Sequence, residues 1–108
     1  MSSAHMHYFT IEQREALERQ LAARAAELRA GFAAEPASDD EIAERAREER
    51  ELAYVEASLK RIHEPEFGLC ADCGAEIPYS RLEANPIAVR CLDCQRSHEA
   101  AAASAAAG

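Results

Sequence analysis

The sequence has 108 residues, with 12 basic and 20 acidic side chains and a formal net charge of −8. Alanine dominates its hydrophobic class, and only three Phe, three Tyr and no Trp are available for packing. This composition excludes a thick globular core and favours long paired helices stabilised by a metal. The negative charge repels nucleic-acid phosphate and anionic lipid, so a protein partner is expected and a membrane is not.

The chain begins with Met-Ser-Ser-Ala-His-Met, which looks like an expression remnant. We therefore expect residues 1–9 to be a disordered, tag-like segment outside the fold. A helical hairpin is predicted to follow over residues 10–64, and a metal-binding unit over residues 65–108.

The first helix is predicted from about Thr10 to about Ala34. Thr10 and Gln13 have the form of a capping box, in which each residue satisfies the other's backbone amide. Gly31 and Pro36 supply the stop signal. Apolar residues recur at helical spacing on one stripe: Leu17, Leu21, Ala25, Leu28 and Phe32.

A second helix is predicted to begin near Asp39. Ser38 and Glu41 suggest another capping box, and acidic residues in the first turn favour the positive end of the helix. Pro65 and Gly68 mark its end before the first cysteine. Its apolar stripe has coiled-coil spacing at its end: Ile42, Ala46, Leu52, Val55, Leu59 and Ile62.

Two apolar stripes joined by a short turn at residues 35–38 predict an antiparallel helical hairpin, or coiled coil. The seam is almost wholly polar between Arg45 and Glu51. Arg45, Arg47 and Arg50 are interpreted as a solvated face paired with neighbouring glutamates, with partner contact left open. We expect the weakest packing nearest the turn.

The four cysteines, Cys70, Cys73, Cys91 and Cys94, form a C-x2-C-x17-C-x2-C array. This spacing is typical of a tetrathiolate site for one structural zinc ion, since each pair can curl through a tight knuckle. Two disulfides or a redox pair are the alternatives. They are disfavoured because the chain shows neither an apolar signal segment nor a βαβ pattern.

The residues around the cysteines are assigned structural roles. Gly74 suits the first knuckle, because glycine takes a positive φ at little cost. Ile77 and Leu82 are expected to form the finger's small core, and Arg81 to support it through carbonyls or thiolates. His63 and His98 are interpreted as surface residues rather than ligands, because four thiolates complete the site.

A last helix is predicted from Leu92 to about Ala107. The predicted fold is therefore mostly α: a hairpin, a small four-cysteine zinc finger and a C-terminal helix. No nucleophile and base pair or phosphate loop is visible, so an enzyme is not expected. The finger lacks a basic face for reading DNA.

The array contains Ile77-Pro78, the segment Arg81-Leu82-Glu83-Ala84-Asn85-Pro86, and Cys91-Leu92-Asp93-Cys94, and it resembles the DksA/TraR family. This resemblance implies a bacterial, cytoplasmic, zinc-containing regulator, expected here as a monomer, that binds RNA polymerase. Its coiled coil would enter the secondary channel and modulate initiation without contacting DNA. The alternative is a zinc-stabilised adaptor that binds another protein without changing transcription.

Family members carry an acidic tip of the form Asp-Pro-x-Asp. The corresponding stretch here is Glu35-Pro36-Ala37-Ser38, so Asp39 or Asp40 would have to replace the second acid. Glu35, Ser38, Asp39 and Asp40 are the candidate partner-binding residues. Helix capping by Ser38 and dipole compensation by the two aspartates explain these residues equally well.

The resemblance indicates two further departures. Counted back from Cys70, the coil is shorter than that of the long family members. Some members bind the alarmone guanosine tetraphosphate through basic residues, and these positions here read Arg47, Tyr54 and Gln95. Only one cation is kept, so a weak or absent alarmone response is predicted.

Overall fold

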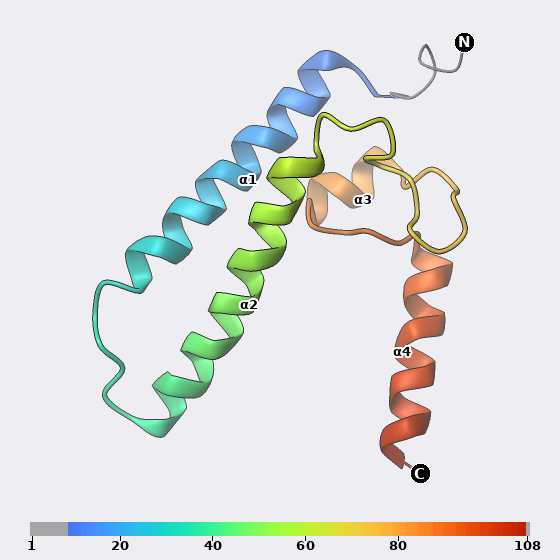
Figure 1. Cartoon of the computed structure of the whole chain (residues 1–108). Coiled ribbons are helices and arrows are strands. Elements are labelled where there is room, and N and C mark those ends of the chain that lie inside the picture. The colour runs from blue at the N-terminus through green and yellow to red at the C-terminus, as the bar shows by residue number, and fades with distance from the viewer. Residues whose placement is uncertain (1–8, 108) are drawn as a thin grey trace.

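The structure is a computed structural model that describes the backbone of residues 9–107. It contains four helices, and the described residues form no strand beyond one isolated bridge between Leu69 and Glu76. This arrangement confirms the mostly α fold with a hairpin and a C-terminal helix (Figure 1). The helices are α1 (Ile11–Gly31), α2 (Asp39–Arg61), α3 (Tyr79–Ala84) and α4 (Leu92–Ala107).

Helix α1 begins at the predicted capping box. The Thr10 hydroxyl accepts the amide of Gln13 at 3.0 Å, and the Gln13 side chain accepts the amide of Thr10 at 2.9 Å. The helix ends at Gly31, three residues before the predicted end at Ala34. The predicted stripe forms the hairpin seam. Phe32 is half-buried, and the other four members are buried: Leu17, Leu21, Ala25 and Leu28.

The second predicted capping box is only half formed. The Ser38 hydroxyl accepts the amide of Glu41 at 3.2 Å, as expected. The Glu41 carboxylate does not return this bond to Ser38, however, but accepts the amide of Ala37 at 2.6 Å. Glu41 therefore fixes the loop before the helix rather than closing the box.

The seam of α2 is apolar at the end nearest the finger. Val55 and Ile62 are buried as predicted, and Ser58, which the apolar pattern missed, is also buried at 2% exposure. The prediction for Ile42 was wrong, because this side chain is 53% exposed. Helix α1 stops at Gly31, so it does not extend far enough to cover Ile42.

Ion pairs cross the middle of the hairpin. Arg24 binds both carboxylate oxygens of Glu51, at 2.6 and 2.8 Å, and Arg29 reaches Glu56 at 2.5 Å. The glutamates of α2 thus pair with arginines of α1. Because these side chains are largely solvent-accessible, the pairs contribute little to stability but favour the observed register.

The finger packs against the base of the hairpin. The Gln20 side-chain amide donates to the carbonyl of Glu83 at 2.9 Å, which joins α1 to α3. Phe9 meets Phe67 edge to face, with ring centroids 6.1 Å apart, and also faces Tyr79. These contacts set the direction in which the hairpin projects (Figure 1).

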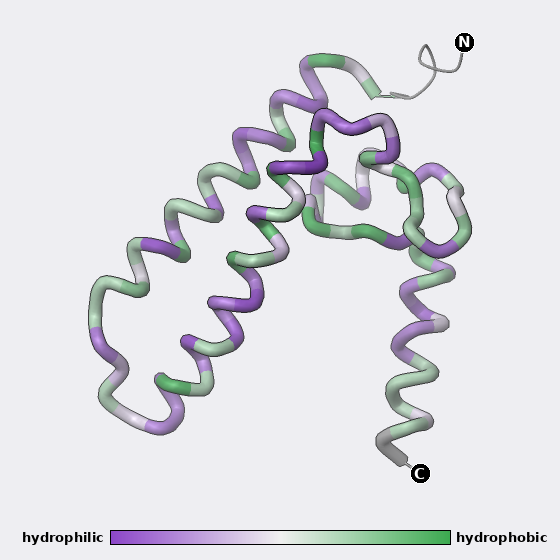
Figure 2. Tube along the Cα trace, in the orientation of Figure 1, coloured by the Kyte–Doolittle hydropathy of each residue, from purple (hydrophilic) through white to green (hydrophobic). Residues whose placement is uncertain are grey.

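Phe9 corrects the expectation for the N-terminal segment. Residues 1–9 were predicted to lie outside the fold, yet Phe9 is 5% exposed and belongs to the core. Residues 1–8 lie outside the described residues. Figure 2 shows hydrophobic and hydrophilic residues alternating along α1 and α2, and none of the described helices has the length and apolar content to span a membrane.

Candidate functional site

The first knuckle is a tight turn around Cys70 and Cys73. Gly74 follows with φ +78°, a left-handed conformation that favours glycine, as the sequence predicted. The amide of Gly74 donates to the carbonyl of Cys70 at 2.9 Å, and the amide of Cys70 donates to the carbonyl of Ala75 at 2.7 Å. The backbone itself therefore folds the two thiols toward one point.

The second knuckle leads directly into α4. Cys91 precedes the helix and Cys94 lies in its first turn, where the carbonyl of Cys91 accepts the amide of Gln95 at 2.9 Å. Thiolates at a helix N-terminus are stabilised by its positive end. The amide of Ala71 donates to the carbonyl of Val89 at 2.7 Å, which ties the two knuckles together.

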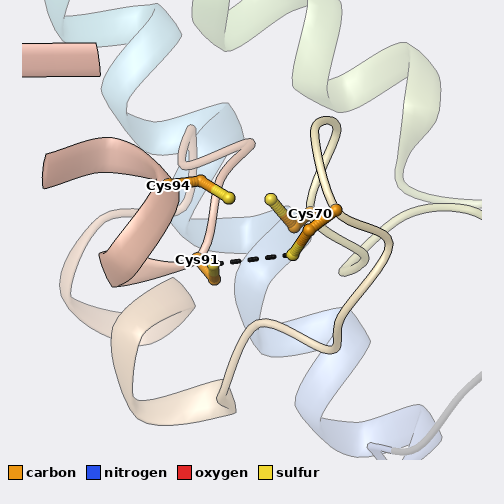
Figure 3. Close-up of side chains that lie close together, drawn as sticks. Cys70, Cys91 and Cys94 are labelled. Carbon is orange, nitrogen blue, oxygen red and sulfur yellow. Dashed lines mark hydrogen bonds between the residues drawn. The ribbon is translucent and has the colours of Figure 1, made fainter. Parts of the chain in front are cut away.

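The four cysteine sulfurs lie within 4.8 Å of one another. Figure 3 shows the side chains of Cys70, Cys91 and Cys94 pointing toward a common centre. The sulfurs of Cys73 and Cys91 are 3.8 Å apart. A tetrahedron with Zn–S bonds of about 2.3 Å has an edge of about 3.8 Å, so the donor set and its spacing fit one zinc ion, and none of the four cysteines is in a disulfide.

The protonation of the metal-free thiols is uneven. Burial of Cys70 raises its pKa, but backbone hydrogen bonds from Cys73, Cys91 and Asp72 outweigh this effect and bring the pKa to about 6. Hydrogen bonding to Cys91, and then to the other thiols, raises the pKa of Cys94. One thiolate thus forms readily, while the last proton must be displaced by the metal.

Side chains around the cysteines brace the two knuckles. The Asp72 carboxylate accepts from Arg90 at 3.1 Å and lies 2.8 Å from the His98 ring nitrogen, linking the first knuckle to α4. Arg81 donates to the carbonyl of Arg90 at 3.1 Å, as expected for a structural arginine. His98 and His63 are exposed, as predicted, whereas the bridging role of Asp72 had no signal in the sequence.

The finger has the small core that the sequence predicted. Ile77 and Leu82 are fully buried, beside Phe67 and Ala88. Leu82 lies on α3, a six-residue helix that the sequence analysis did not predict. These apolar residues support the loop between the two knuckles. The chemistry of the finger therefore resides in its four cysteines.

The candidate tip residues lie at the far end of the hairpin from the finger (Figure 1). Glu35, Ser38, Asp39 and Asp40 are all exposed, and the two aspartates occupy the first turn of α2. The contacts of Arg45 were not predicted from the sequence: its guanidinium donates to the carbonyls of Phe32 and Ala34. Arg45 is therefore not simply part of a solvated face, because it caps the end of α1.

The three positions compared with the alarmone-binding residues are only partly brought together. Tyr54 and Gln95 line one hollow of about 520 Å³ between α2 and α4, and Arg47 is not among its lining residues. Arg81 and Arg90 also line it, but each donates its Nε to a partner within the finger.

Residues 65–100 match the family model of the prokaryotic dksA/traR C4-type zinc finger. This part of the chain is therefore similar to a DksA/TraR zinc finger. The cysteine cluster at its centre is accordingly a site for one zinc ion. When bound, zinc supplies a structural cross-link between the two knuckles, and four thiolates leave no open coordination position for catalysis.

The matches to curated relatives cover about half of the chain. The RNA polymerase-binding transcription factor DksA of Escherichia coli is 42% identical over 55 residues, which cover 51% of this chain and 36% of that protein. The factor of the same name from Haemophilus influenzae is 44% identical over 55 residues, 38% of its length. The matched segment thus spans little more than a third of these relatives.

Solved structures resemble a larger part of the chain. The RNA polymerase binding protein and transcriptional regulator Dks from Chlamydia trachomatis superposes with a TM-score of 0.63 at 25% identity. The superposition covers 86% of this chain and 94% of that one. Transcription factor DksA2 from Pseudomonas aeruginosa, at 22% identity and a TM-score of 0.52, shares the fold over 82% of this chain and 76% of its own.

Proposed function

We propose that this protein is a zinc-containing transcription regulator of the bacterial cytoplasm that binds RNA polymerase. Its hairpin, residues 10–64, enters the secondary channel and modulates initiation, and the unit of residues 65–108 anchors it. The observation that carries this proposal is the superposition on the Chlamydia protein described as an RNA polymerase binding protein and transcriptional regulator, because it includes the hairpin as well as the finger.

The shape of the hairpin supports insertion into a channel. Helix α1 has 21 residues and α2 has 23, so each is about 32 to 35 Å long at 1.5 Å per residue. The hairpin base is buried against the finger while its tip stands free (Figure 1). The exposed acids Glu35, Asp39 and Asp40 are the groups placed to meet the interior of a partner.

The charge supports a protein partner rather than DNA. The net charge is −8, and the arginines Arg81 and Arg90 are engaged in hydrogen bonds within the finger. A DNA reader needs free cations on one face. We therefore propose that regulation proceeds without direct DNA contact.

The alarmone makes at most a weak contribution in this proposal. Tyr54 and Gln95 face the hollow between α2 and α4 without supplying a cation at the two compared positions. Each replaced charge removes a charge-assisted contact to phosphate. Arg96 lines the same hollow together with Arg81 and Arg90, so guanidinium groups remain there for weak binding.

A second function, an adaptor without transcriptional effect, is favoured by one observation. Ser38 replaces the acid of the family's tip, and its hydroxyl is engaged in capping α2. If Asp39 and Asp40 serve only the helix start, the tip has no groups for the polymerase active centre. The hairpin would then bind a partner through its sides.

Transcription from a ribosomal promoter by purified bacterial RNA polymerase tests the proposal, after binding has been measured. The test variant carries Glu35→Ala, Asp39→Ala and Asp40→Ala. Its matched control carries Glu12→Ala, Glu15→Ala and Glu66→Ala, three exposed acids away from the tip, so that both variants lose the same charge.

We expect the wild type and the control to inhibit transcription and the tip variant to bind without inhibiting. Binding by the wild type with no effect on transcription would mean a channel occupant with an inactive tip. No binding to the polymerase would favour the adaptor.

A further inference from the structure

Two side chains of α2 hold the loop between the helices. The Arg45 guanidinium donates to the carbonyl oxygens of Ala34 and, at 3.4 Å, Phe32, just beyond the end of α1. The Glu41 carboxylate accepts the amide of Ala37, just before α2, at 2.6 Å. The two contacts therefore fix opposite ends of the loop at residues 32–38.

Arg45 also stacks on an aromatic ring. Its guanidinium carbon lies 5.0 Å from the centroid of Phe32, and both side chains are half-buried. The carbonyls at the end of α1 have no partners within the helix, and a cation there complements the helix dipole. Both hydrogen bonds come from one terminal nitrogen, Nη2, while the planar guanidinium stacks on the ring. A lysine ammonium could donate to the carbonyls but could not stack on the ring in the same way, so lysine is only a partial substitute.

The charge beneath the loop makes this arginine hard to replace. A hollow of about 170 Å³ lies there, and Arg45 is the one cation among its lining residues. The same hollow is lined by four carboxylates: Glu35, Glu41, Glu44 and Glu48. Without Arg45 these carboxylates would face one another without a counter-charge, and their repulsion would favour opening of the loop.

We propose that Arg45 is the positioning residue of the hairpin tip. It locks the loop in one conformation and so fixes Glu35 relative to Asp39 and Asp40 before any partner is met. A preformed tip avoids the entropic cost of ordering seven residues on binding. This role in transcription rests on the proposed function, whereas the locking of the loop does not.

Hydrogen exchange of the isolated protein tests the locking. The probes are the amide of Ala33, which donates to the carbonyl of Ala30 at 3.3 Å, and the amide of Ala37. We expect Arg45→Ala to speed exchange of these amides about tenfold or more, as for a lost charged hydrogen bond. The control is Arg47→Ala, an exposed arginine on the same helix, which should leave both amides unchanged.

The transcription assay tests the positioning. Arg45→Ala should still bind polymerase like the wild type, because the seam and base are intact. At concentrations that saturate binding, the effect on transcription should fall about tenfold. Arg45→Lys keeps the charge and a hydrogen-bond donor but loses the planar group that stacks on Phe32, so it should recover only part of both effects. A general loss of stability would weaken binding and the transcriptional effect together, so unchanged binding with a smaller effect distinguishes the positioning role.

Each outcome decides the proposal. Exchange in Arg45→Ala no faster than in Arg47→Ala would overturn the locking. Faster exchange with a full transcriptional effect would overturn the positioning role. Complete recovery by Arg45→Lys would overturn the part played by stacking of the guanidinium on Phe32. If the wild type has no effect on transcription, the proposed function fails, while the exchange comparison still decides whether Arg45 locks the loop.

Discussion

The two ends of the hairpin are held by different forces. At the base, Leu17 and Ile62 are fully buried and Phe9 packs on Phe67, so apolar contacts fix the hairpin against the finger. At the tip, Ile42 is 53% exposed and Arg45 holds the loop by polar contacts. The few large apolar residues of this chain therefore orient the hairpin at its base, whereas charged and polar contacts hold its tip.

This difference separates anchoring from recognition. Apolar burial at the base is insensitive to salt, whereas contacts between exposed charges at the tip weaken as ionic strength rises. The base should therefore stay fixed at ionic strengths that weaken the contacts of the tip.

Removal of the metal should have the largest effect. Binding of zinc to a structural site contributes about 10 to 16 kcal/mol to folding. Chelation, or Cys94→Ser, should abolish exchange protection of the finger amides of Ala71, which joins the two knuckles, and of Ile77, which closes the loop around the first. Metal analysis should give one zinc per untreated chain. A metal-free chain with the finger's protection intact would contradict the account.

The same site predicts a pH dependence. Neighbouring thiols raise the pKa of Cys94 in the metal-free chain, so this thiol keeps its proton at neutral pH and zinc must displace it. The apparent affinity for zinc should therefore rise from about pH 6 to about pH 8 and fall on acidification. Competition with a chromophoric chelator across this range measures the slope, and a flat profile would contradict the assignment.

Two isoleucines of the hairpin give the next largest contrast. Ile62→Ala should lower the free energy of unfolding by about 2 to 5 kcal/mol, because it leaves a cavity at a fully buried position. Ile42→Ala, at an exposed position, should change it by less than about 0.5 kcal/mol. Urea unfolding of both variants measures the difference, and similar losses would show that the tip is packed like the base.

The helix caps should give a smaller contrast. Each substitution removes one side-chain hydrogen bond, of 3.0 Å at Thr10 and of 3.2 Å at Ser38. The Thr10 bond also belongs to a closed capping box, in which the Gln13 side chain accepts the Thr10 amide. Loss of a cap costs about 0.5 to 2 kcal/mol, so we expect Thr10→Ala toward the upper end and Ser38→Ala toward the lower. Thermal unfolding followed by helicity compares the two variants, and a larger loss at Ser38 would mean that the tip is more important for stability than the base.

The smallest predicted effect belongs to Glu51. The hydrogen bond from Arg24 holds the pKa of Glu51 below its ordinary value. Its contribution is therefore present above the ordinary carboxyl pKa and is lost as the pH falls through the lowered value. Glu51→Gln should cost about 0.2 to 1 kcal/mol at neutral pH and nothing in acid. Glu49→Gln, at an exposed neighbouring position, is the matched control and should cost less than Glu51→Gln at neutral pH.

The features that were predicted from the sequence are those encoded by nearby residues. The Thr10 and Gln13 capping box, the seam of α1 and the zinc cluster all depend on short spacings. The start of α2 at Asp39 was likewise readable from the Ser38 cap that precedes it.

The features that were missed depend on tertiary contacts. Phe9 is buried only because Phe67 and Tyr79, far along the chain, meet it. Ile42 fits the helical period of α2 but loses its partner where α1 ends at Gly31. Arg45 looked like one more charge on a solvated face, since nothing nearby in the sequence indicates the carbonyls that it caps.

Photocrosslinking tests most directly the claim that the tip enters the polymerase. A crosslinking amino acid at the exposed Ala37 should attach to polymerase residues that line the secondary channel. The same group at the exposed Ala103, on α4, should crosslink outside the channel or not at all. Channel crosslinks from Ala37 alone are the predicted result. Channel crosslinks from Ala103, or crosslinks from Ala37 confined to the outer surface of the polymerase, would contradict the account.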